Sequence, residues 1–196
     1  MKPDAALPTF RLEPSASIAQ ADPWYSRPVT LDSPALEVMT DLTKFRAATT
    51  QPTVSLREAE QTMIYQGVRM LFVVTDMPSI EGLVTTTDLG GDKPTRVTQE
   101  RRVHYADLCV ADVMTPLSML DAIDLDRMQS ATVRQVIATL RVFGRNHLLV
   151  RDHAPAGGWP RVRGVISRSQ IERQLGTTID ITPIASSFAE IERALL

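Results

Sequence analysis

Hydrophobic residues recur along this chain first at helical spacing and then in short continuous runs. The helical spacing is carried by Leu56, Ala59, Met63 and Ile64. Ser55 before these positions is a favourable N-cap, and Gly67 after them is typical of a residue that ends a helix. The runs 70–74 and 82–85 are each typical of a strand, and 86–89 opens a short helix. We therefore expect a helix, two strands and a second helix here.

The same order of elements returns in the second half of the chain. A second helix has its apolar face at Val133, Val136, Ile137 and Leu140. Thr132 caps this helix and Gly144 ends it, and strands are expected at 148–150 and 162–166 before a closing helix at 167–175. The aligned stretches are 38–40 with 113–115, 53–74 with 130–151, and 82–85 with 164–167. The chain therefore contains an internal repeat.

The repeat predicts an α+β fold of two tandem β-α-β-β-α units. One unit buries too little core to be stable alone, so we expect the two to pack through their sheets. Five of the 13 prolines fall in the first 28 residues, which predicts an extended arm, and apolar residues at helical spacing from about Pro183 predict a C-terminal helix. The expected boundaries are 1–30 for the arm, 31–92 for the first repeat, 93–107 for a linker, 108–176 for the second repeat, and 177–196 for the helical tail.

Composition narrows the class of protein. The 196 residues are 43% hydrophobic and 22% charged, which is ordinary for a globular chain and excludes a largely disordered one. The formal net charge of -2 gives no global attraction to nucleic acid, and no run is long and apolar enough to span a membrane. The N-terminus lacks an apolar signal core, so we expect a cytoplasmic protein without nucleic-acid or membrane partners.

Motifs for catalysis are missing from the sequence. It has no G-x-S-x-G, no P-loop and no G-x-G-x-x-G, and its three histidines lack metal-ligand spacing. Its single cysteine, Cys109, allows no intramolecular disulfide and no multi-cysteine metal site. We therefore expect a binding protein without a metal or a required cofactor, not an enzyme.

Three features together resemble a tandem CBS domain pair, the Bateman module, as found in stand-alone bacterial CBS-domain proteins. They are Val-Met-Thr before each copy, the helix ending in Gly67-Val68-Arg69 or Gly144-Arg145-Asn146, and a run from Gly82 to Leu89 similar to the family's Gly-apolar-apolar-Ser/Thr-x-x-Asp signature. The resemblance covers about residues 36–176. It implies a regulatory module that binds an adenosine-containing ligand, such as AMP, ADP or ATP, between the copies, and it also implies a homodimer.

The resemblance also implies where the ligand binds. A carboxylate at a helix start can accept hydrogen bonds from both ribose hydroxyls, which is the role implied for Asp88. Thr85 would lie near the ribose or phosphate, and Arg69 matches a position that often contacts phosphate. Thr49 matches the position whose backbone edge meets adenine. Asp88 and Thr85 can equally well cap their own helix, and Arg69 can be a surface arginine.

The second copy departs from the family pattern. Ser167 is kept, but Gln170 stands where the signature has aspartate, and Asp126 stands at the position equivalent to Thr49. We therefore expect one good nucleotide cleft and a second cleft that is empty, altered or specific for a different group. Arg168 is placed to meet a phosphate between the copies, and His147 is a further candidate contact.

Two hypotheses follow. The first is a regulatory CBS pair that binds an adenine nucleotide and thereby changes its association with a protein partner, through the arm or the terminal helix. The alternative is a ligand-free scaffold for dimerisation and protein interaction, with Trp24 and Phe188 marking partner surfaces. Nucleotide-dependent stability separates the two hypotheses.

Overall fold

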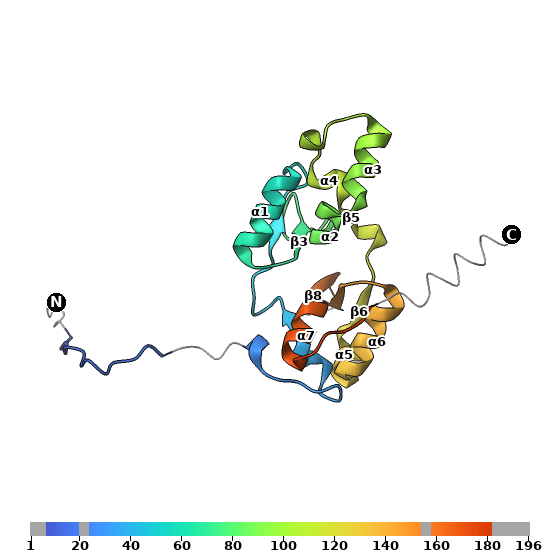
Figure 1. The fold of residues 1–196 in the computed structure, drawn as a ribbon. Coiled ribbons are helices and arrows are strands. Elements are labelled where there is room, and N and C mark those ends of the chain that lie inside the picture. Colours follow the sequence, from blue (N-terminus) through green and yellow to red (C-terminus); the bar gives the residue numbers. More distant parts are fainter. Residues whose placement is uncertain (1–6, 20–23, 154–157, 182–196) are drawn as a thin grey trace.

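The fold consists of two stacked units, each with one sheet (Figure 1). The computed structural model describes residues 7–19, 24–153 and 158–181. The first sheet runs in the order β2 (Thr49–Thr50), β3 (Met70–Val73), β4 (Gly82–Thr85) and β5 (Thr115–Pro116). The second runs in the order β1 (Met39–Asp41), β8 (Pro160–Ser167), β7 (His147–His153) and β6 (Ala122–Asp124). The prediction of an α+β fold is confirmed.

Helices and 3-10 turns fill the segments between the strands. The α-helices are α1 (Leu56–Gln66), α2 (Thr86–Gly90), α3 (Asp92–Arg101), α4 (Val110–Val113), α5 (Leu125–Ser130), α6 (Val133–Phe143) and α7 (Arg168–Leu175). The 3-10 turns are η1 (Trp24–Ser26), η2 (Ala35–Val38), η3 (Tyr105–Asp107) and η4 (Leu117–Met119). The stretch 93–107, expected as a linker, carries most of α3 together with η3. The predicted C-terminal helix and Phe188 lie outside the described residues.

Local signals set the ends of the two longest helices. The Ser55 hydroxyl accepts a hydrogen bond from the Glu58 amide, and the Glu58 carboxylate accepts one from the Ser55 amide, which closes a capping box at the start of α1. Gly67 and Gly144 end α1 and α6 with φ values of 65° and 58°, in the left-handed region that glycine adopts without strain. The expected apolar face of α6 is buried. On α1 the expectation is wrong for Ile64, which is 75% exposed.

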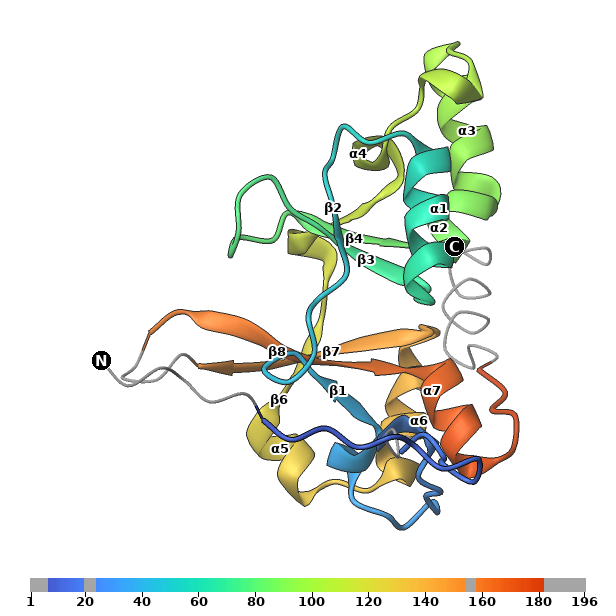
Figure 2. The ribbon, with the colours of Figure 1, turned by 90° about the vertical axis from the view of Figure 1, so that its left-hand side faces the viewer.

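Three apolar cores stabilise the fold. One core lies inside each unit, between its sheet and its helices, and the third lies between the two sheets. Strand β3 serves two of them, because Leu71 and Val73 point to the helices of the first unit while Met70 and Phe72 point to the second sheet. Leu149 and Val165 meet them from the second sheet. The two units therefore pack through their sheets, as expected (Figure 2).

In each sheet, one edge strand comes from the other repeat. Strand β1 lies near the start of the first repeat but pairs antiparallel with β8 of the second, and β5 lies near the start of the second repeat but pairs antiparallel with β4 of the first. Each of these two edge strands lies close to a glycine of the strand with which it pairs. A Cβ on Gly164 would lie 2.6 Å from the Met39 sulfur, and a Cβ on Gly82 would collide with the Thr115 carbonyl oxygen. The exchange links the two units covalently and through hydrogen bonds.

The close passage at Gly82 predicts a stability effect. Gly82→Ala should lower the free energy of unfolding by roughly 1–3 kcal/mol, because the Thr115 oxygen belongs to the backbone and cannot swing aside. Urea denaturation measures the change. Gly90→Ala is the matched control, since a Cβ there meets nothing within 4 Å, and it should leave stability unchanged or slightly raised. Equal stability of the two variants would contradict the tight crossing.

Candidate ligand-binding cleft

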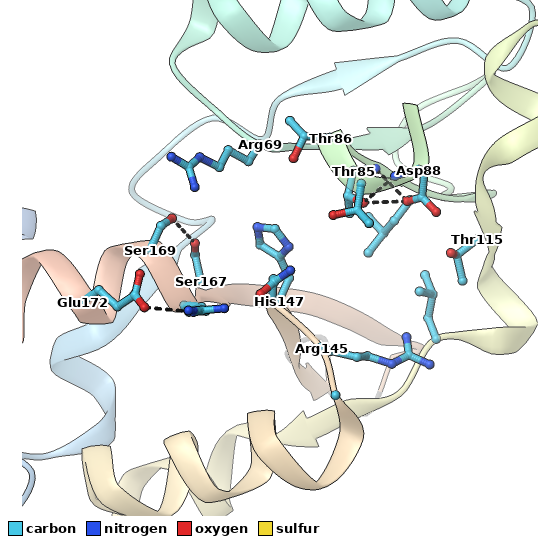
Figure 3. Close-up of a pocket in the computed structure, with 16 residues that line it drawn as sticks. Arg69, Thr85, Thr86, Asp88, Thr115, Arg145, His147, Ser167, Ser169 and Glu172 are labelled. Carbon is cyan, nitrogen blue, oxygen red and sulfur yellow. Dashed lines mark hydrogen bonds and ion pairs between the residues drawn. The ribbon is translucent and has the colours of Figure 1, made fainter. Parts of the chain in front are cut away.

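A cleft of about 610 Å³ opens between the two units, where the helix starts of both repeats face each other (Figure 3). Six of the seven predicted site residues line it, namely Arg69, Thr85, Asp88, His147, Ser167 and Arg168. The seventh, Thr49, lies on β2 beside Phe72, and it is not among the described residues that line this cleft or the second one. We call this space the first cleft.

The start of α2 forms one wall of the first cleft. Thr85 is the N-cap, and both its amide and its hydroxyl donate to Asp88 Oδ2, at 2.9 and 2.7 Å. Lys93 Nζ donates to Asp88 Oδ1 at 3.1 Å and to the Met114 carbonyl oxygen at 3.2 Å. The Asp88 side chain thus caps its helix while remaining 17% exposed. A carboxylate has about four lone-pair sites, so its Oδ1 retains capacity for a further donor.

Arginines supply the positive charge of the first cleft. Arg168 Nε pairs with Glu172 at 2.9 Å, and Arg145 donates to the Met119 carbonyl oxygen at 3.3 Å and lies 3.7 Å from Asp121. The guanidinium of Arg69 makes no hydrogen bond or ion pair with any residue in the described part of the chain. Arg69 is therefore the cation whose hydrogen bonds are available to an anionic ligand.

His147 lies at the start of β7, opposite Ser167 on β8, between Arg69 on one side and Asp88 on the other (Figure 3). Burial, and then the positive charge of Arg69, lower the pKa of His147 to about 4, and the negative charge of Asp88 only partly offsets this. The ring is therefore neutral near pH 7. A neutral imidazole offers one donor and one acceptor to a ligand.

A smaller space of about 340 Å³, the second cleft, adjoins the first on the side of α7. It shares Arg69, His147, Ser167 and Ser169 with the first cleft. Gln170 lines it at the helix position equivalent to Asp88. The lining also includes Arg46 and Arg173, and none of the described residues in it is a carboxylate. The first cleft therefore contains the Asp88 carboxylate, whereas the second has the Gln170 amide at the equivalent position. This is the same difference that the sequence shows between the two repeats.

Two residues near the first cleft were missed from the sequence. Arg145 directly follows the helix-ending Gly144, whereas Arg69 stands two positions after Gly67, so the repeat alignment does not pair them. An arginine beside a helix end was the available signal. Lys93 falls in the stretch expected as a linker and reaches Asp88 only because α3 folds back beside α2.

The described residues contain neither a metal-binding cluster nor a membrane-spanning helix. Within these ranges, no cluster of three or more His, Cys, Asp or Glu side chains has an arrangement that could bind a metal ion. None of the helices in the same ranges is both long and apolar enough to cross a bilayer.

Comparison with known proteins identifies the architecture. No protein-family model and no curated protein matches the chain. Among solved structures, an uncharacterized conserved protein from Pyrococcus horikoshii matches with a TM-score of 0.51 at 20% identity, over 73% of this chain and 92% of that one. CBSX2 in complex with AMP matches with a TM-score of 0.50 at 19% identity, over 72% and 94%. The CBS domain structure NE2398 matches with a TM-score of 0.50 at 21% identity, over 69% and 94%.

The low pKa of His147 predicts a pH dependence of stability. The unfolded chain has a histidine pKa near 6.5, so between about pH 6.5 and 4 it binds more protons than the folded chain, and stability falls as the pH falls. Between pH 7.5 and 5, the free energy of unfolding should fall by about 2 kcal/mol less in His147→Asn than in the wild type, as measured by urea denaturation at both pH values. His153→Asn, at the exposed end of β7, is the control and should keep the wild-type loss. An unchanged pH dependence in His147→Asn would contradict the assignment.

Proposed function

We propose that this chain, whose fold is that of a tandem CBS-domain pair, is a regulatory module that binds an adenosine-containing ligand in the first cleft. AMP, ADP and ATP are the candidates. The observation that carries the proposal is the pairing, across one cleft, of a partly exposed carboxylate on Asp88 with the uncommitted guanidinium of Arg69. A nucleotide presents the complementary pair of groups, a ribose diol and a phosphate.

Each lining residue has a role in this proposal. Asp88 accepts hydrogen bonds from the ribose hydroxyls, and Arg69 binds the phosphate, supported by the more distant charges of Arg145 and Arg168. Thr85 and Ser167 lie at the starts of α2 and α7, where polar side chains meet a ligand that spans the units. Neutral His147 can form a hydrogen bond with the ligand, and it does not repel the neighbouring Arg69 guanidinium. Thr49 is left out of the contact set, because it does not line the cleft.

The geometry also supports a regulatory role. Asp88 and Arg69 belong to the first repeat, whereas Arg145 and Arg168 belong to the second, so one ligand contacts both units. A ligand shifts a conformational equilibrium only as far as it binds one arrangement better than the other. Binding across the cleft favours the arrangement in which the two sets of side chains are close. We propose that a protein partner distinguishes this arrangement. The presence of AMP in the similarly folded CBSX2 structure supports the ligand class.

A thermal-shift titration with AMP, ADP and ATP tests the ligand. A nucleotide at about 100 times its dissociation constant should raise the free energy of unfolding by about 2.7 kcal/mol, equivalent to roughly 5–10 °C for a chain of this size. Asp88→Ala should abolish this rise.

The control must lose a helix cap without touching the cleft. Glu58→Ala meets that need, because Glu58 closes the capping box of α1 as Asp88 closes that of α2. It should lower the melting temperature of the free protein and leave the nucleotide-induced rise intact. The proposal fails if none of the three nucleotides stabilises the wild type, or if Asp88→Ala responds like Glu58→Ala.

We also propose that the chain forms a homodimer through the C-terminal ends of α1 and α6. Ile64 and Tyr65 are exposed on α1, and Val142 and Phe143 are exposed on α6. Tyr65 and Val142 occupy equivalent positions of the two repeats. In a dimer with a twofold axis, the exposed apolar end of α1 in one copy can therefore contact the exposed apolar end of α6 in the other. This contact occurs twice, as in an isologous interface.

Light scattering after size-exclusion chromatography tests the dimer. The wild type should have twice the mass of one chain, and Tyr65→Lys combined with Val142→Lys should have the mass of one, because two charges would be buried at each contact. Trp159→Lys is the control, since Trp159 is 90% exposed directly before β8 and belongs to neither helix. A monomeric wild type, or a double variant that remains dimeric, would contradict this interface.

A further inference from the structure

Gln170 is occupied by a contact that the repeat pattern does not predict. Its Nε2 donates to the Tyr25 carbonyl oxygen at 2.8 Å and to Gln174 Oε1 at 2.9 Å. Both partners are acceptors, so this atom must be the amide nitrogen. Gln170 thus connects α7 to the end of the N-terminal arm.

Gln174 continues the same connection one turn further along α7. Its side chain is almost completely buried, at 3% exposure, and its Nε2 donates to the carbonyl oxygens of Arg27 and Glu37. The Val29 amide donates to the Gln174 carbonyl oxygen at 3.1 Å, and Val29 itself packs in the core of the second unit. The hydrogen bonds engage backbone atoms of the arm, so they fix the path of the chain.

The arm also makes a side-chain contact with α7. The guanidinium of Arg173 lies over the Tyr25 ring, 5.8 Å from its centroid. Arg173 and Gln170 both line the second cleft. The arm therefore binds the helix face that forms one wall of that cleft.

An aspartate at position 170 could not make this connection. Its side chain is shorter and, when ionised, accepts hydrogen bonds but donates none, so the hydrogen bond from residue 170 to the Tyr25 carbonyl oxygen would be lost. At the equivalent position of α2, Asp88 instead turns back to cap Thr85. Ser167, at the N-cap position of α7, makes no such capping hydrogen bond with a described residue, and its hydroxyl is hydrogen-bonded to that of Ser169. The two repeats use the same helix position for different purposes.

We propose that Gln170 anchors residues 24–30 to α7 and thereby withholds a ribose site from the second cleft, so that the chain binds one adenosine ligand instead of two. The stoichiometry rests on the proposed function, whereas the anchor does not. The second cleft keeps its arginines but lacks the carboxylate that would accept a ribose diol.

Two variants separate the anchor from the missing carboxylate. Gln170→Met keeps the length of the side chain but removes its donors, and Gln170→Asp removes the donors and adds the carboxylate. Hydrogen exchange followed by mass spectrometry should show the Val29 amide exchanging roughly fivefold to tenfold faster in both variants. Calorimetric titration with AMP should give one site in the wild type and in Gln170→Met, and two sites in Gln170→Asp.

The outcomes distinguish this proposal from the proposed function. Unchanged exchange at Val29 in both variants would overturn the anchor, and two AMP sites in the wild type, or only one in Gln170→Asp, would overturn the stoichiometry. A wild type that binds no AMP would refute the proposed function together with the stoichiometry. Hydrogen exchange at the Val29 amide in Gln170→Met would still show whether Gln170 anchors the arm.

Discussion

The apolar contact between the two sheets is the interaction on which the rest of the structure depends. Met70, Phe72 and Leu83 from one sheet meet Leu149 and Val165 from the other, and water is excluded from both faces. Separating the two sheets would expose these side chains to water, at a cost in free energy that grows with the apolar area exposed. The exchange of β1 and β5 ties the two sheets further, because each sheet ends in a strand that the chain supplies from outside the corresponding repeat.

This packing brings the helix starts of the two repeats together at the cleft. Strand β4 leads into α2 and β8 leads into α7, so the polar ends of both strands face each other beyond the apolar contact. Asp88 and Arg69 come from one unit and Arg168 from the other. The positive charges would repel one another if they were all free, and Glu172 relieves part of this repulsion by pairing with Arg168. The charge of Arg69 remains for a ligand.

Much of the fold could be predicted from the sequence because its signals are local. Capping residues, helix-ending glycines and apolar spacing lie within a few residues of one another, and α1 and α6 have the expected ends. The strand exchange could not be predicted in this way, since β1 has three residues and its partner β8 lies more than a hundred residues later. Ile64 has the spacing of a core residue, but it lies at the edge of the helix face and is exposed.

The candidate site was predictable to the extent that the repeat carries it, which is why six expected residues line one cleft. The contact of Gln170 with Tyr25 was not, because it joins positions that no repeat relates. The most direct test of the account is a crystal structure of the chain grown with AMP. We expect the ribose hydroxyls at Asp88, the phosphate at Arg69 and no AMP beside Gln170. AMP bound without contact to Asp88, or no AMP in the first cleft at saturating concentration, would contradict the account.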